Sequence, residues 1–275
     1  MSGYTRADFG TTVRNDFDNR RAQSNMLHTD MMEKSLQASA GTLVEARALG
    51  HPDFEHLPVG AKATAPMVAV FLDLTNFTGR TFWDDQEETA DLAHAVLSGF
   101  IKTVIDYGGH PLGLRGDGLF AGFSPGDPAF AATMALSACA FALDGVQNEV
   151  NPWLDQREMA RVQARAGLDY GPVTFVRTGN HDSSEINPIG FAANFAAKCE
   201  KKANSWEVVV GQGLAGLLPG YPHFDEHEDS PKEYQRDYQK AYYKFFNYRW
   251  RNTLQHLTGV TESLGGTPTS QIYGR

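Results

Sequence analysis

The sequence predicts an α+β fold in which helices pack on a mainly antiparallel sheet. Three observations lead to this prediction: short apolar runs typical of buried strands, a Gly-Asp-Gly turn between two short strands, and amphipathic helices between the strands. The expected order is strand, helix, β-hairpin, helix, two strands, helix and strand. That order describes helices packed on a largely antiparallel sheet.

The first expected strand is the apolar run at residues 66–73, which lacks the alternation of a half-exposed strand. Asp84 and Asp85 then begin a helix whose apolar side chains recur at i, i+4 and i+8. Gly108-Gly109 ends this helix, because glycine favours the left-handed conformation found at helix C-termini.

A β-hairpin and a second helix are expected next. Residues 110–115 and 119–123 predict the hairpin, which turns at Gly116-Asp117-Gly118. Asp127 and Pro128 are a typical N-cap and first-turn proline of the Ala-rich helix that follows. The later elements are predicted as strands at 161–169 and 173–177 with a turn at Tyr170-Gly171-Pro172, a helix at 191–203, and strands at 206–210 and 242–248.

The chain divides into three parts. Residues 1–65 form an N-terminal helical extension and connector, with apolar side chains spaced for one or two amphipathic helices. The main domain spans residues 66–250. The tail at residues 251–275 is rich in Gly, Thr and Ser and is expected to be poorly ordered.

Composition excludes several classes of protein. The chain has 275 residues, 41% of them hydrophobic, and a net charge of -9, which argues against a general nucleic-acid binder. Cys139 and Cys199 are its only cysteines, too few for a disulfide framework or a Cys-rich metal site. No apolar run reaches the roughly 20 residues that span a bilayer, and the N-terminus has no signal-peptide core, so a cytoplasmic protein without membrane insertion is expected.

Two aspartates lie where predicted β-elements end. Asp73 follows the first apolar strand, and Asp117 lies between the two glycines of the hairpin turn. If these strands are neighbours, the two carboxylates lie side by side, an arrangement suited to holding divalent cations against a triphosphate. Each aspartate alone is also an ordinary turn residue.

Four segments are similar, in order and spacing, to motifs of the class III nucleotidyl cyclase catalytic domain. They are Phe71-Leu72-Asp73-Leu74-Thr75-Asn76-Phe77-Thr78, Arg115-Gly116-Asp117-Gly118, Arg165-Ala166-Gly167-Leu168-Asp169-Tyr170-Gly171-Pro172-Val173 and Gly190-Phe191-Ala192-Ala193-Asn194-Phe195-Ala196-Ala197-Lys198. The resemblance covers roughly residues 66–250 and implies a ferredoxin-like cyclase domain.

The resemblance implies roles for the first two segments. Asp73 and Asp117 would bridge two divalent cations, Mn²⁺ or Mg²⁺, and the Leu74 carbonyl would ligate one of them. The backbone N–H groups of the turn at Asn76, Phe77 and Thr78 would bind the β- and γ-phosphates of a nucleoside triphosphate. The reaction implied is cyclisation of the nucleotide with release of pyrophosphate.

In the same family, two residues of the last segment act on the site of the partner subunit. Asn194 aligns with a ribose-positioning asparagine, and Lys198 aligns with a transition-state arginine. A head-to-tail homodimer with sites at the interface is therefore implied. Lysine keeps the positive charge but loses the bidentate fork of arginine. Lys198 could also be part of the solvated face of its helix.

The base-reading positions depart from the purine cyclases. Adenylate and guanylate cyclases carry a lysine or glutamate four residues before the hairpin aspartate, where Gly113 stands here, and the adenine-reading aspartate is replaced by Asn187. Arg115 adds a cation beside Asp117 that could instead pair with a nearby acid. This pattern resembles the Pycsar-type pyrimidine cyclases of bacterial anti-phage defence, which make cyclic UMP or cyclic CMP for a separate effector. UTP is favoured, because arginine or an amide N–H can donate to the uracil carbonyls.

Three alternatives remain open. The chain could be an adenylate cyclase with an atypical purine pocket, or a catalytically silent cyclase-like regulatory module that retains both aspartates. A diguanylate cyclase would share a two-metal core, but the Gly-Gly-Asp-Glu-Phe signature is absent from the sequence.

Overall fold

The computed structural model describes residues 3–34, 49–180, 183–257 and 259–272. Its elements in chain order are α1 (Arg6–Lys34), β1 (Lys62–Thr75), α2 (Phe77–Trp83), α3 (Gln86–Asp106), β2 (His110–Arg115), β3 (Gly118–Phe123), α4 (Pro128–Gly145), η1 (Val146–Val150), α5 (Asn151–Gln156), β4 (Gln163–Gly179), β5 (Ser184–Ile189), α6 (Phe191–Lys202), β6 (Val208–Gly211), α7 (Gln212–Ala215), β7 (Phe224–Glu226), β8 (Lys232–Arg236), β9 (Gln239–Tyr243), β10 (Phe245–Tyr248), η2 (Trp250–His256), α8 (Val260–Leu264) and η3 (Thr269–Gln271). The predicted α+β class is confirmed.

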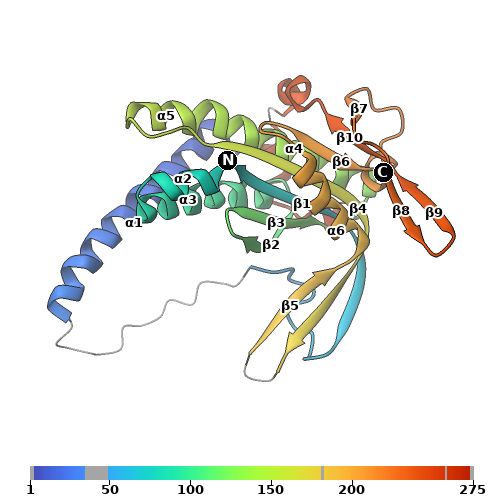
Figure 1. Cartoon of the computed structure of the whole chain (residues 1–275), viewed down its shortest axis with the longest axis horizontal. Helices are drawn as coiled ribbons and strands as arrows, with labels where there is room; N and C mark the ends of the chain where they lie inside the picture. Colours follow the sequence, from blue (N-terminus) through green and yellow to red (C-terminus); the bar gives the residue numbers. More distant parts are fainter. Residues whose placement is uncertain (1–2, 35–48, 181–182, 258, 273–275) are drawn as a thin grey trace.

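The large sheet is mainly antiparallel, as the sequence predicts (Figure 1). Its strands follow the order β2-β3-β1-β4-β6-β10-β7, and β5 pairs with β4 outside this path. The β4–β6 pair is parallel, and the other pairs are antiparallel. Strands β8 and β9 form a separate two-stranded sheet. Strand β1 is central, because it pairs with β3 on one side and with β4 on the other.

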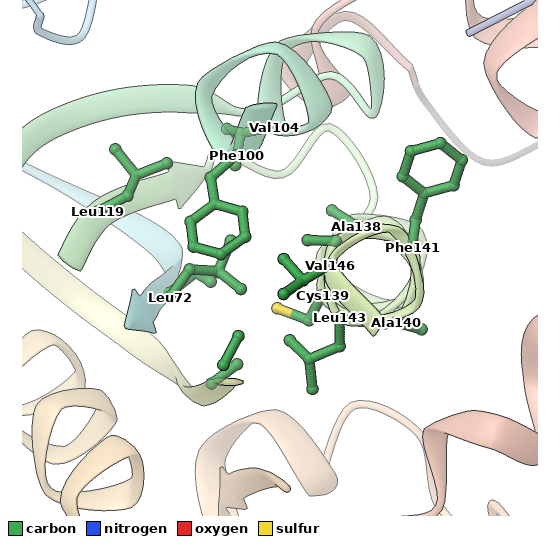
Figure 2. Close-up of a cluster of buried hydrophobic side chains, with 14 of the residues drawn as sticks. Leu72, Phe100, Val104, Leu119, Ala138, Cys139, Ala140, Phe141, Leu143 and Val146 are labelled. Carbon is green, nitrogen blue, oxygen red and sulfur yellow. The ribbon is translucent and has the colours of Figure 1, made fainter. Parts of the chain in front are cut away.

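One face of the sheet carries the main hydrophobic core. Leu72 of β1 and Leu119 of β3 lie beneath Phe100 of α3, and Cys139 and Leu143 of α4 close the cluster (Figure 2). Full burial of a side chain the size of Leu or Phe contributes about 1.5–3 kcal/mol. This core keeps β1 and β3 side by side, which is what brings Asp73 and the hairpin turn together.

Helix α4 begins as predicted. The Asp127 carboxylate accepts the Phe130 N–H at 2.8 Å, and Pro128 occupies the first turn. Among the described residues one helical stretch, Pro128–Gln156, is long and apolar enough to cross a membrane. Its apolar window is 78% buried inside the protein, so it is the central helix of the core.

Helix α6 covers the opposite face of the sheet. Its buried alanines, Ala192, Ala193 and Ala196, pack in a second core cluster with Val173 of β4. A Cβ atom at Gly167 would overlap the backbone of α6. The glycine therefore lets the helix approach the backbone of β4 directly.

The predicted turn at Tyr170-Gly171-Pro172 is wrong, because β4 runs through it without interruption. Pro172 lies opposite Pro66 of β1 in the antiparallel register. The missing N–H groups of both prolines therefore fall at one point of the ladder, where β5 and β6 do not pair with β4. The sequence reveals the proline but not its partner across the sheet.

The two ends of the chain join the domain. In α1, Phe9, Val13 and Phe17 are buried in the main core. The second helix considered for the extension falls mostly on residues 35–48, outside the described residues. The expected disorder of the tail is wrong for the described residues 251–257 and 259–272. Thr269 is fully buried and donates to the Ser124 carbonyl oxygen at 2.7 Å.

The last predicted strand is also divided. Residues 242–248 contain the end of β9 and all of β10, which belong to different sheets. The aromatic side chains of both strands give one continuous β-like pattern in sequence, so the break at residue 244 is not visible there.

Candidate functional site

A row of four residues crosses four strands at the edge of the proposed site. Arg115 of β2 lies opposite Gly118 of β3, Gly118 lies opposite Asp73 of β1, and Asp73 lies opposite Arg165 of β4. Residues opposite one another in antiparallel strands share a face of the sheet. The Asp73 carboxylate is thus placed on the α6 side of the sheet, in a row with two arginines and a glycine.

Asp117 directly precedes Gly118, the residue that pairs with Asp73 of β1. It is half-buried in the turn between β2 and β3, and the Leu74 N–H donates to its carbonyl oxygen at 3.4 Å. Burial raises the pKa of the Asp117 carboxyl, the negative charge of Asp73 raises that pKa further, and Arg165 partly offsets both effects. Two carboxylates close enough to repel one another are the feature expected of a cation site.

Arg165 is a site residue whose role the sequence reasoning missed. Its guanidinium donates to Asp73 Oδ2 from Nη2 at 2.9 Å and from Nε at 3.1 Å. The same Nη2 lies 2.5 Å from Oε1 of Glu200, near the C-terminal end of α6. All three side chains are no more than 26% exposed. The only sequence signal is the position of Arg165 in one of the four motif-like segments.

Glu200 is the second acid in this arrangement. Burial raises the pKa of its carboxyl to about 7, and the Asp73 charge adds to the effect while Arg165 opposes it. The guanidinium therefore lies between two acids and fixes the orientation of Asp73 from the β4 side. Through Glu200 it also ties β1 to α6.

The predicted phosphate-binding turn directly follows β1. Asn76 adopts a left-handed conformation with φ of 59° and precedes α2, whose N-terminus has no side-chain cap. The first N–H groups of a helix have no partner within the helix. Phe77 lies beside Asp117 in a cavity of about 250 Å³. This cavity is bounded by Phe77, Thr81, Ala93, Gly116 and Asp117. Thr78 follows in the first turn of α2.

Asn194 and Lys198 lie elsewhere. Both are on the exposed face of α6, one turn apart, whereas Glu200 faces the sheet. Lys198 Nζ donates to the Tyr234 hydroxyl of β8 at 3.0 Å and lies 4.8 Å from the centre of that ring. Within one chain, the structure therefore does not bring these two residues to Asp73 and Asp117.

The predicted base-reading residues are also separated. Gly113 pairs with Phe120 just after an irregularity in β2, whereas Asn187 is exposed on β5 and pairs with Val176. Arg115 is exposed, and its Nη1 donates to the Leu114 carbonyl oxygen at 3.1 Å. No interaction among the described residues joins Asn187 to Arg115. The alternative role of Arg115, an ion pair with a nearby acid, is not found among the described residues either.

The donor set fits a divalent cation. Asp73 and Asp117 supply hard carboxylate oxygens, and a cation would stabilise the charged form of Asp117, whose pKa is raised by burial and by the charge of Asp73. No group of three or more His, Cys, Asp or Glu side chains within the described part of the chain could hold a metal ion. A cation here would therefore need backbone, substrate or water oxygens as further ligands.

Comparison with solved structures shows the fold. The guanylyl cyclase Cya2 is 15% identical with a TM-score of 0.57, and the match covers 70% of this chain and 94% of that one. The adenylyl cyclase CyaB from Pseudomonas aeruginosa is 18% identical with a TM-score of 0.57, covering 68% and 95%. The chain therefore has the fold of the adenylyl and guanylyl cyclase domains.

A third neighbour has a different description. The class III adenylyl cyclase-like ATP-binding protein from Pseudomonas aeruginosa is 16% identical with a TM-score of 0.56, covering 70% of this chain and 43% of that one. Neither protein-family models nor curated protein sequences match this chain. At these identities the likeness concerns the fold, and the activity has to be argued from the residues of the site.

Proposed function

We propose that this chain is a nucleotidyl cyclase that converts a pyrimidine nucleoside triphosphate, UTP or alternatively CTP, to its 3′,5′-cyclic monophosphate and pyrophosphate. The observation that carries the proposal is the placement of Asp73 and Asp117. Asp73 lies on β1 and Asp117 in the turn that leads into the neighbouring strand β3, and burial together with the charge of Asp73 raises the pKa of Asp117. Two neighbouring carboxylates at the ends of β-elements in a cyclase fold are suited to binding divalent cations.

The two aspartates would hold two divalent cations, Mn²⁺ or Mg²⁺, with the Leu74 carbonyl as a further ligand. When bound, such cations lower the pKa of the attacking 3′-hydroxyl and neutralise charge on the phosphates. Arg165 orients Asp73 for this purpose. The uncapped turn at Asn76, Phe77 and Thr78 supplies N–H donors for the terminal phosphates.

The complete site requires a second copy of the chain. Asn194 and Lys198 are exposed on α6 and face away from their own aspartates. In a head-to-tail homodimer, Asn194 of the partner subunit would position the ribose, and Lys198 of the partner subunit would stabilise charge at the α-phosphate. One structural neighbour is described as a non-canonical dimeric guanylyl cyclase domain from Blastocladiella emersonii, which supports dimer formation in this fold but not the head-to-tail arrangement itself.

Pyrimidine specificity rests on the base-reading positions. Gly113 offers no side chain and Asn187 offers an amide, so neither purine-reading charge is present. Arg115 is exposed, in a row with Asp73, and has no ion-pair partner among the described residues. Apart from Nη1, which donates to the Leu114 carbonyl oxygen, its donors could bind the carbonyl oxygens of uracil, which favours UTP, whereas the Asn187 carbonyl could accept from the amino group of cytosine.

One experiment tests both the reaction and the base. The purified chain is given ATP, GTP, CTP and UTP together with Mn²⁺, and the cyclic products are resolved by mass. Cyclic UMP or cyclic CMP as the main product supports the proposal. Cyclic AMP as the main product would instead support an adenylate cyclase, which the named adenylyl cyclase neighbours favour.

A silent binding module is the second candidate. The observation in its favour is the neighbour described as an adenylyl cyclase-like ATP-binding protein. Such a module would bind nucleotide without turnover, so metal-dependent release of pyrophosphate would exclude it. The retention of both aspartates favours the enzyme.

The setting of the reaction follows from the resemblance to the anti-phage cyclases. The product would be a second messenger made in the cytoplasm and read by a separate effector that binds cyclic nucleotides. Phage challenge of cells that carry the chain with a candidate effector tests this role. Protection that disappears in the Asp73→Ala variant is the expected result.

A further inference from the structure

Asp169 is a buried carboxylate that the proposed reaction does not use. It lies in β4 and is 0% exposed. The Tyr243 hydroxyl of β9 donates to its two oxygens at 3.0 and 3.3 Å, and the Leu214 N–H of α7 donates to Oδ1 at 3.2 Å. Asp169 therefore joins three segments that are distant in sequence.

The surroundings of this carboxylate are built to fit it. A Cβ atom at Gly213 would lie 2.9 Å from Asp169 Oδ1, and one at Gly211 would overlap the carboxylate. The Gly213 N–H also donates to the Tyr243 oxygen at 2.8 Å, which directs the tyrosine proton toward Asp169. Burial raises the pKa of Asp169 to about 6, and hydrogen bonds from the Tyr170 N–H and from the Tyr243 hydroxyl partly offset that rise.

Tyr243 connects this buried acid to the β8–β9 hairpin. Its ring packs edge-on against Phe191 and Phe195 of α6, with ring centres 4.8 and 4.5 Å apart. Tyr243 lies opposite Lys232, at the base of the hairpin. Because β8 and β9 do not pair with the large sheet, their position against α6 depends on side-chain contacts of this kind.

The hairpin in turn contacts Lys198. The Tyr234 hydroxyl of β8 accepts from Lys198 Nζ at 3.0 Å, and its ring lies beneath the ammonium group. A cavity of about 540 Å³ lies between the C-terminal half of α6 and the hairpin, together with the segment that precedes β8. Its lining includes Lys198, Lys202, Asp229, Lys232, Glu233 and Phe245.

We infer that Asp169 and Tyr243 are positioning residues. Their hydrogen bond holds the β8–β9 hairpin against α6, and the hairpin holds the Lys198 ammonium group through Tyr234. Neither residue touches the nucleotide. The part of this inference that concerns Lys198 rests on the proposed function, in which Lys198 acts at the site of the partner subunit.

The test removes one oxygen. Tyr243→Phe keeps the ring on α6 but deletes the hydroxyl, and Tyr238→Phe is the matched control, because Tyr238 is a fully exposed tyrosine in the turn of the same hairpin. Backbone amide exchange of residues 232–243 should become about tenfold faster in Tyr243→Phe, since a hydrogen bond to a buried charge is lost. It should not change in Tyr238→Phe. Equal exchange in wild type and Tyr243→Phe would overturn the inference.

A double-mutant cycle tests the link to Lys198. Tyr243→Phe alone should lower kcat about tenfold with KM for the nucleotide unchanged. In the Lys198→Ala background it should cause no further loss, because the group that it positions is gone. If the kcat losses of the two single substitutions multiplied in the double variant, positioning through Lys198 would be contradicted. If the wild type turns over none of the four nucleotides, the proposed function fails, whereas amide exchange still decides whether the hairpin is held by Tyr243.

Discussion

Asp73 on β1 lies directly opposite Gly118 on β3, and a Cβ atom at Gly118 would be 2.9 Å from Asp73 Oδ1. The absent side chain therefore makes the space in which the carboxylate lies. On the other side of Asp73, the Arg165 guanidinium approaches to 2.9 Å. Asp73 thus lies between an arginine and a glycine, and these two neighbours fix the position of its carboxylate relative to Asp117.

Gly118→Ala should displace this carboxylate. The added methyl group would also lie 3.3 Å from the Leu72 carbonyl oxygen, so the strand cannot easily move to accommodate it. We expect kcat/KM to fall about a hundredfold, with a raised Mn²⁺ requirement, because a small displacement at a reacting centre has a large cost. Titration of activity with Mn²⁺ measures both effects. Gly50→Ala is the control for a glycine substitution, because the nearest atoms to a Cβ atom there are 3.8 Å away, in the flexible Glu55 side chain.

Asp73→Ala and Asp117→Ala should each lower turnover about a thousandfold or more while the protein remains folded. The reason is that each variant removes one of two carboxylates that would share the cations. Activity is measured as release of pyrophosphate, and folding is measured by circular dichroism. Asp155→Ala serves as the control, because that aspartate is exposed and pairs with Arg161 outside the site. Full activity in either site variant would overturn the metal assignment.

Arg165→Ala should destabilise the fold. The change leaves the Asp73 and Glu200 carboxylates together without a cation, in a place where neither side chain is more than 18% exposed. We expect the free energy of unfolding to fall by about 2 kcal/mol, measured by urea denaturation. Arg165→Lys keeps the charge and should recover part of the loss. Equal stability of Arg165→Ala and wild type would show that the ion pairs contribute nothing net.

Acidification should destabilise the protein through His51. This ring is 2% exposed, its Nδ1 accepts the Asp53 N–H at 3.2 Å, and its Nε2 contacts Ser124 Oγ at 2.7 Å. Nδ1 must be unprotonated to accept the Asp53 N–H, so protonation of the ring breaks this hydrogen bond. Burial, and to a smaller extent the nearby charge of His110, lower the pKa of His51 to about 4.

The sign follows from the comparison with the unfolded chain. An unfolded histidine binds its proton near pH 6.5, whereas the folded one resists protonation until about pH 4. The contribution of the neutral ring to the free energy of unfolding is therefore fully present above about pH 6.5. It falls by about 3 kcal/mol in all as the pH decreases toward 4. Unfolding curves of wild type and His51→Gln between these pH values measure the effect. His256→Gln, at an exposed position, should keep the wild-type pH dependence.

Local signals were sufficient for several elements. The hairpin at Gly116-Asp117-Gly118 and the N-cap at Asp127 are where the sequence predicts them, because turns and caps depend on a few adjacent residues. The same local reasoning fails at Pro172. A proline usually interrupts a strand, but here the register with Pro66 removes the conflict, and register depends on the partner strand.

The sequence by itself determined that an acid stands at the end of each of two β-elements and that Asn194 and Lys198 share one face of a helix, since spacing along a strand or helix is a local property. Only the tertiary structure decided that Arg165 lies between Asp73 and Glu200, and that Tyr243 reaches Asp169. Those contacts join residues 35 to 92 positions apart. They exist because the packing of the sheet and of α6 brings distant strands together, and no local pattern in the chain records that packing.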